Sequence, residues 1–136
     1  MIEFDYKREY LRTGKIIYRP VAKIYLLKNA SEWIPEYFYI DSGADYTLIP
    51  YKMGKFLSLD KTASEIQEIG GIGGVIAIRL SNIPMKIGKY GFDSTIAWAQ
   101  IEHVPLLLGR ENVFEHFEII FRQKVRKVVF IWQGKK

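Results

Sequence analysis

The chain has 136 residues, is 49% hydrophobic, 15% aromatic and 26% charged, carries a net charge of +5 and has no cysteine. This composition predicts one globular domain spanning residues 1–136, and the lack of cysteine excludes a disulfide framework, a zinc ribbon and a thiol nucleophile. No apolar run reaches the roughly 18 residues of a membrane helix and the charged N-terminus is unlike a signal peptide, so we expect a cytoplasmic protein without a membrane partner.

Strand patterns dominate the first half of the chain, where β-branched and aromatic residues are frequent. Residues 16–27 and 33–40 are apolar runs separated by an Asn-Ala-Ser turn, which predicts two strands. A polar Asp-Ser-Gly step follows, and residues 47–49 resume the apolar pattern. Pro50 is suited to the first position of a helix, so we expect a short helix that ends near Leu57.

The second half predicts three hairpins, a strand and a helix. The strands of the hairpins are residues 65–69 with 75–80, 83–87 with 92–99, and 118–121 with 125–132. Residues 104–108 form a continuous apolar run that predicts a strand buried on both faces, and residues 111–117 predict a helix. The sequence therefore predicts one mostly-β domain with one or two short helices.

The basic residues are concentrated at the end of the chain. Residues 119–136 hold six of the 20 Lys and Arg and no acid, whereas residues 1–118 carry 14 basic and 15 acidic residues. No nucleic-acid recognition motif accompanies this segment, so we do not expect a nucleic-acid partner. The simpler interpretation is a basic C-terminal hairpin over residues 118–136 whose charges discourage edge-to-edge aggregation.

A polar turn, Asp41-Ser42-Gly43-Ala44-Asp45, lies between two apolar strands. A carboxylate at the end of a buried strand costs free energy unless it is hydrogen-bonded or paired. The Ser42 hydroxyl and the Gly43 backbone N–H are both candidates to hold Asp41. Taken alone, these residues are explained more simply by an ordinary turn, because Asp, Ser and Gly are frequent turn residues.

The glycine-rich tip of the first hairpin is the segment Ile69-Gly70-Gly71-Ile72-Gly73-Gly74. It lacks the Gly-Lys-Ser/Thr of a phosphate loop and the spacing of a dinucleotide-binding loop. Two interpretations remain open, a flexible hairpin tip and a mobile flap whose backbone approaches a ligand closely.

A third segment, Leu107-Leu108-Gly109-Arg110, ends the apolar run at residues 104–108. A buried arginine requires an acid, and Asp45 is a candidate partner. In their order and spacing, the Asp-Ser-Gly-Ala turn, the glycine-rich tip and this segment resemble the retropepsin family, the single-lobe aspartic proteases of retroviruses and their relatives. The resemblance covers roughly residues 18–121.

The resemblance implies a closed, retropepsin-like barrel with a flap hairpin, and an aspartic endopeptidase that needs no cofactor and no metal. The family uses two catalytic aspartates, and this chain has one Asp-Ser-Gly. The resemblance therefore implies a homodimer that cuts peptides or unfolded proteins with one Asp41 from each copy. The family roles place Asp41, Ser42 and Gly43 in catalysis and Arg110 in support of the turn. They place the following residues against substrate: Ala44, Asp45, Leu48, Ile69, Gly70, Gly71, Ile72, Gly73, Gly74 and Leu107.

Two departures from the family leave an alternative open. In the viral enzymes the chain termini build much of the dimer interface, and here the basic C-terminal segment either replaces that role or blocks it. Tyr46 stands where the viral relatives usually have a second acid. The alternative is a catalytically silent module of the same fold that binds peptides or proteins.

Overall fold

The computed structural model describes residues 1–61, 63–71 and 74–134, and these are predominantly β-strand. The one α-helix of the described residues is α1 (Tyr51–Phe56), and two short 3₁₀ turns are η1 (Leu59–Lys61) and η2 (Gln123–Val125). The strands are β1 (Ile2–Asp5), β2 (Lys7–Tyr10), β3 (Ile16–Arg19), β4 (Val21–Lys28), β5 (Glu32–Ile40), β6 (Thr47–Ile49), β7 (Ile66–Gly71), β8 (Gly74–Ile87), β9 (Tyr90–Ala99), β10 (Leu107–Leu108), β11 (Phe117–Arg122) and β12 (Lys127–Trp132).

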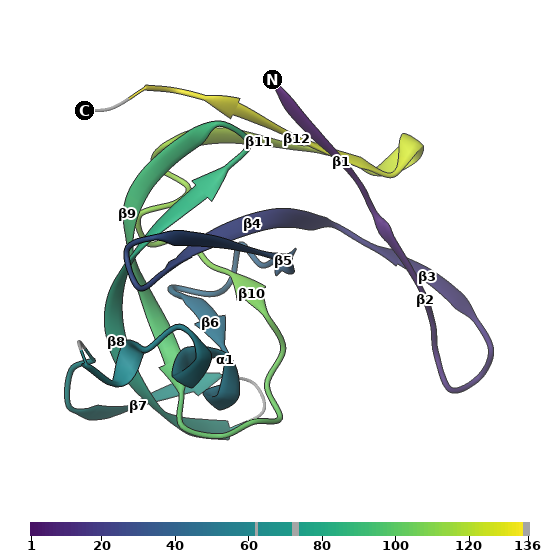
Figure 1. Cartoon of the computed structure of the whole chain (residues 1–136). Helices are drawn as coiled ribbons and strands as arrows, with labels where there is room; N and C mark the ends of the chain where they lie inside the picture. The colour runs from purple at the N-terminus through teal and green to yellow at the C-terminus, as the bar shows by residue number, and fades with distance from the viewer. Residues whose placement is uncertain (62, 72–73, 135–136) are drawn as a thin grey trace.

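The strands form three sheets (Figure 1). Seven strands pair in the order β4-β5-β10-β6-β9-β8-β7, and β8 also pairs with β4. The chain ends meet in a second sheet of order β1-β12-β11, and β2 pairs only with β3 in the third. Figure 1 shows the β2–β3 hairpin reaching out from the body of the chain. Mostly-β architecture with short helical segments was the fold class predicted from the sequence.

Most of the strand predictions are confirmed, with two corrections of continuity. The run at residues 16–27 is divided into β3 and β4 at Pro20, which has no N–H to donate to a sheet ladder. The strands predicted at 75–80 and 83–87 are one strand, β8, which serves both hairpins.

Two predictions in the last quarter of the chain are wrong. Residues 111–116 form consecutive turns instead of a helix, because Asn112 adopts a left-handed conformation with φ 63° and its side-chain oxygen accepts a hydrogen bond from the Thr95 N–H at 2.8 Å. The run at 104–108 is a strand only at Leu107 and Leu108, and Pro105 in it is exposed.

The buried apolar side chains form two clusters. The larger one includes Phe38, Ile49, Leu108 and Phe130 and extends to the terminal sheet. The smaller one is built by Leu48 of β6, Ile78 of β8, and Ala97 and Ala99 of β9. Ile69 and Leu107 pack against this smaller cluster, so it lies beneath the residues that the sequence singled out.

The terminal sheet joins the two ends of the chain. Ile2 pairs with Phe130 and Asp5 with Lys127 along β1 and β12. The Lys127 ammonium lies 3.7 Å from a Glu3 carboxylate oxygen and also pairs with Asp5, and Asp5 raises the pKa of Lys127 most. The N-terminal acids therefore offset part of the charge of the basic C-terminal hairpin. In the part of the chain that the structure describes, no helix is long and apolar enough to cross a membrane.

Candidate active site

Asp41 lies immediately after β5, at a point fixed by buried backbone. Phe38 is fully buried and Ile40 is 8% exposed, so the end of β5 is anchored in the core. The parallel strand β10 lies beside it, with Leu108 opposite Ile40. The Asp41 N–H donates to the Leu108 carbonyl at 3.0 Å, which extends this pairing by one residue.

The turn itself holds the Asp41 carboxylate through backbone. The Gly43 N–H donates to Asp41 Oδ1 at 2.9 Å, and the Ala44 N–H donates to the Asp41 carbonyl at 3.2 Å. A Cβ at Gly43 would stand 3.3 Å from Asp41 Oδ1, so glycine allows this close approach. Ser42 is exposed and, among the described residues, its hydroxyl makes no hydrogen bond to Asp41. Of the two groups proposed to hold the carboxylate, the backbone N–H does so.

The segment after β10 braces the turn from its other side. Gly109 lies so close to the preceding chain that a Cβ there would stand 2.3 Å from the Tyr46 carbonyl carbon. Its N–H donates to the buried Thr47 hydroxyl at 3.2 Å. The Arg110 N–H donates to the Ala44 carbonyl at 3.0 Å, so the two segments are also joined by their backbones. Only glycine fits at the crossing of these two segments.

The ion pair proposed between Arg110 and Asp45 is present. An Arg110 terminal nitrogen donates to Asp45 Oδ1, but the side chains are 54% and 76% exposed, respectively. The arginine is therefore not buried, contrary to the expectation from the sequence. An exposed pair of this kind contributes little to stability, so the backbone contacts hold the turn more firmly.

A pocket of about 450 Å³ separates the turn from the hairpin of β7 and β8. An adjoining pocket of about 280 Å³ includes Leu48, Ile69 and Gly70 as well, and extends to Gly74. Gly71 pairs with Gly74 at the end of the hairpin, and Gly74 has φ 114°, a conformation that glycine adopts without strain. The first pocket is lined by Asp41, Gly43, Ala44, Asp45, Tyr46, Leu48, Ile69 and Gly70.

Most residues proposed for substrate contact are therefore close to Asp41. Ile72 and Gly73, proposed as the flap tip, lie outside the described residues. Leu107 lines a different pocket, on the other side of Asp41. Tyr46, noted from the sequence only as a departure from the family, lines the same pocket as Ile69 and Gly70.

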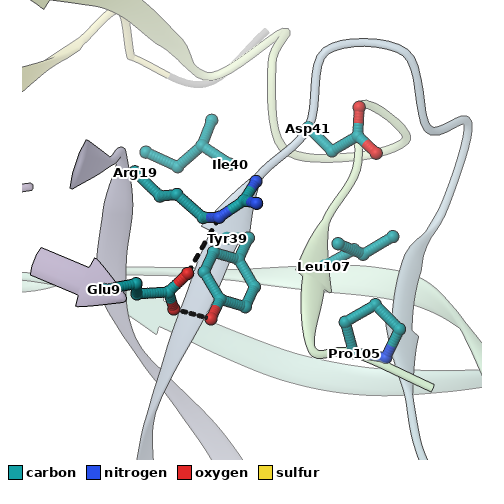
Figure 2. Close-up of a pocket in the computed structure, with 7 residues that line it drawn as sticks. All are labelled: Glu9, Arg19, Tyr39, Ile40, Asp41, Pro105 and Leu107. Carbon is teal, nitrogen blue, oxygen red and sulfur yellow. Dashed lines mark hydrogen bonds and ion pairs between the residues drawn. The ribbon is translucent and has the colours of Figure 1, made fainter. Parts of the chain in front are cut away.

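The pocket on the other side of Asp41 has a volume of about 500 Å³ and includes residues that the sequence did not suggest. Glu9 and Arg19 come from the β2–β3 hairpin, most of which precedes residues 18–121, the region resembling the retropepsins (Figure 2). No motif or apolar pattern identifies them, because their position depends on how the hairpin folds back to β5. Its lining residues are Glu9, Arg19, Tyr39, Ile40, Asp41, Pro105 and Leu107.

Polar contacts connect the hairpin to β5 in this pocket. Arg19 Nε donates to Glu9 Oε1 at 2.8 Å, and the Tyr39 hydroxyl donates to Glu9 Oε2. Lys7 Nζ lies 3.2 Å from Glu9 Oε2. The hydrogen bond from Tyr39 lowers the pKa of Glu9 most, and Lys7 and Arg19 act in the same direction. Glu9 is thus held in its ionised form.

No set of three or more His, Asp or Glu side chains within the described ranges is arranged to hold a metal ion. No protein-family model matches the sequence, and no curated protein matches it. The structure is similar to that of the EIAV protease solved in complex with the inhibitor HBY-793. The TM-score is 0.53 at 20% sequence identity, over 79% of this chain and 92% of that protease chain. The chain therefore has a mostly-β fold of the retroviral protease type.

Proposed function

We propose that the chain is an aspartic endopeptidase with a closed, retropepsin-like barrel, and that it acts as a homodimer. The observation that carries the proposal is the placement of Asp41. Its carboxylate is oriented by the Gly43 N–H and borders a pocket with Ile69 and Gly70 of the β7–β8 hairpin on the opposite wall. The fold likeness to the EIAV protease supports the same assignment.

The proposed chemistry requires two copies, because each chain has one Asp-Ser-Gly. In a two-fold dimer, the two Asp41 carboxylates would meet near the axis. Carboxylates about 3 Å apart do not both ionise readily, so they share one proton and titrate as a pair. The exposed Ser42 hydroxyl is free to reach the turn of the second copy.

Peptide hydrolysis would follow from this shared proton. The ionised carboxyl takes a proton from a water molecule, whose oxygen attacks the carbonyl carbon of the scissile bond. The protonated carboxyl donates its proton to the carbonyl oxygen. The tetrahedral intermediate then collapses and the C–N bond breaks. The leaving nitrogen takes the proton that the first carboxyl received from water, and a hydroxyl of the intermediate returns a proton to the second carboxyl. This sequence of steps needs neither a covalent intermediate nor a metal ion.

The pockets beside Asp41 would receive the peptide. Leu48 and Ile69 line the pocket under the hairpin and favour apolar side chains of the substrate. The backbone of Gly70, Gly71 and Gly74 would approach the peptide from above, as glycine permits. Leu107 would contact a second side chain in the pocket on the other side of Asp41.

The first test compares the wild type with Asp41→Asn on an unfolded protein and a peptide library, from acidic to neutral pH. We expect cleavage by the wild type and its loss in Asp41→Asn, because the amide neither takes up a proton from water nor shares one. Asp93→Asn is the matched control, since Asp93 is exposed and is followed by Ser94 and Thr95 without a glycine. Equal cleavage by wild type and Asp41→Asn, or no cleavage by a dimeric wild type, would contradict the proposal.

One observation favours the silent binding module as a second candidate. The first and last strands of the chain already pair with each other, β1 with β12. β12 has β1 on one side and β11 on the other, so it has no free edge for a terminal strand of a second copy. Analytical ultracentrifugation at micromolar concentration separates the candidates, because a strict monomer has one Asp41 and supports only binding.

A further inference from the structure

The pocket formed by the β2–β3 hairpin has a polar wall and an apolar wall, with Asp41 at its edge (Figure 2). Leu107 and Pro105 supply the apolar wall, and Glu9 and Arg19 supply polar groups from the hairpin. Apolar side chains alone would explain the other proposed subsites. The charged groups here raise the question of which ligand group they would accept.

Both oxygens of the Glu9 carboxylate already accept hydrogen bonds from neighbouring donors. Its Oε1 accepts from Arg19 Nε at 2.8 Å. Its Oε2 accepts from the Tyr39 hydroxyl and lies 3.2 Å from Lys7 Nζ. The formal charges of Lys7, Arg19 and Glu9 leave this group with one positive charge in excess. Asp41, which lines the same pocket, offsets this excess, and a cationic ligand group would meet a Glu9 carboxylate whose two oxygens already have donors.

Arg19 retains unused donors in the same pocket. Among the described residues its Nε is hydrogen-bonded, and its two terminal nitrogens are not. The guanidinium carbon lies 5.9 Å from the centre of the Tyr39 ring, which supports its planar group. Figure 2 shows the terminal nitrogens directed away from Glu9, toward the side of the pocket where Asp41 lies. Two adjacent guanidinium nitrogens match the two oxygens of a carboxylate.

We propose that this pocket is an acid-binding subsite, in which Arg19 binds the side-chain carboxylate of a Glu or Asp residue in the substrate. The inference rests on the proposed endopeptidase function and names a preference of that same site. Pro105 and Leu107 contact the methylene groups of the bound side chain, while the terminal nitrogens of Arg19 bind its oxygens. Glu9 and Tyr39 hold Arg19 in position from behind and are positioning residues.

The test uses an apolar peptide that the wild type cleaves, with Glu or Gln placed at each position around the cut in turn. We expect one position at which Glu raises kcat/KM about tenfold over Gln, mainly through KM, because a hydrogen-bonded charge pair contributes about that factor. In Arg19→Gln the ratio falls to about one. Arg8→Gln removes a charge from the same hairpin and keeps the wild-type ratio, since Arg8 binds the Tyr10 hydroxyl instead.

Measurements on the wild type alone also test the inference, in case Arg19→Gln disturbs the hairpin. The Glu-to-Gln ratio falls as salt rises, because ions screen the guanidinium. Cleavage by the wild type without an acid preference at any position overturns the inference and leaves the endopeptidase standing. A preference that Arg19→Gln retains also overturns it. Absence of any Asp41-dependent cleavage overturns both.

Discussion

The Asp41 turn and the β2–β3 hairpin line the same pocket, yet different interactions hold them. Buried backbone contacts fix the turn, among them the Asp41 N–H to the Leu108 carbonyl and the Gly109 N–H to Thr47. The hairpin strands pair only with each other, and the polar contacts to Tyr39 link them to β5. Arg19 is half-exposed, and the Glu9 side chain is 22% exposed.

This contrast suggests that the turn and the hairpin have different roles in the pocket. A turn braced by buried backbone keeps one geometry, which a catalytic carboxylate requires. An element held by partly exposed polar contacts and by Tyr18, which packs against the larger apolar cluster, opens at lower free-energy cost than the turn and adjusts to its ligand. On the proposed function, the turn would carry the chemistry, and the hairpin would carry part of the selectivity.

Gly109→Ala is the change expected to damage the turn most. Its Cβ would stand 2.3 Å from the Tyr46 carbonyl carbon and oxygen, and backbone atoms have little room to move away. We expect a loss of about 3 kcal/mol in the free energy of unfolding, measured by urea denaturation. Gly91→Ala is the control, because the nearest atom to its Cβ is the Met85 carbonyl oxygen at 3.8 Å. Equal stability of the two variants would show that the chain is not tightly packed where Gly109 crosses Tyr46.

The difference between local patterns and long-range contacts explains which elements could be predicted from the sequence. The strands around Asp41 follow from local apolar runs such as residues 33–40, which become β5. The helix expected at residues 111–117 failed because Asn112 adopts a left-handed conformation and accepts a hydrogen bond from the distant Thr95. Local periodicity does not report such a long-range contact.

The residues of the site also fall into two groups, those that the sequence predicted and those that it did not. The Asp41 turn, Leu48 and Ile69 were found through their order and spacing along the chain. Arg19 and Glu9 were not, because ten residues separate them in sequence and they meet Tyr39 only when the hairpin packs on β5. Charged residues in a strand are usually solvent-facing, so nothing in the sequence distinguishes these two from their neighbours.

Glu9→Gln should loosen the β2–β3 hairpin without affecting the Asp41 turn. The pKa of Glu9 is lowered from its ordinary value near 4.5, so the ionised form stabilises the docked hairpin. At pH 7 we expect the variant to lower the free energy of local opening by about 1.5 kcal/mol, seen as faster hydrogen exchange in β2 and β3. Exchange in β5 and β10 should stay unchanged.

The pH dependence of this effect has a definite sign. A lowered folded-state pKa gives stability that is fully present above about 4.5 and is lost as the pH falls through the folded value. The difference between wild type and Glu9→Gln should therefore shrink as the pH falls below 4.5. Glu118→Gln, at an exposed residue of β11, is the control and should leave the hairpin unchanged. A difference that persists unchanged at low pH would contradict the role of the ionised carboxylate.

Asp45→Asn should have the smallest effect on stability, although Asp45 belongs to the turn. Its side chain is 76% exposed, and its backbone carbonyl still accepts from the Glu111 N–H at 2.8 Å in the variant. We expect a loss of about 0.5 kcal/mol or less in the free energy of unfolding of the monomer. Thermal unfolding at several protein concentrations provides the check, because a dimer-linked contribution makes the midpoint depend on concentration. A loss above about 1.5 kcal/mol at every concentration would mean that the Arg110 pair, rather than the backbone, holds the turn within one copy.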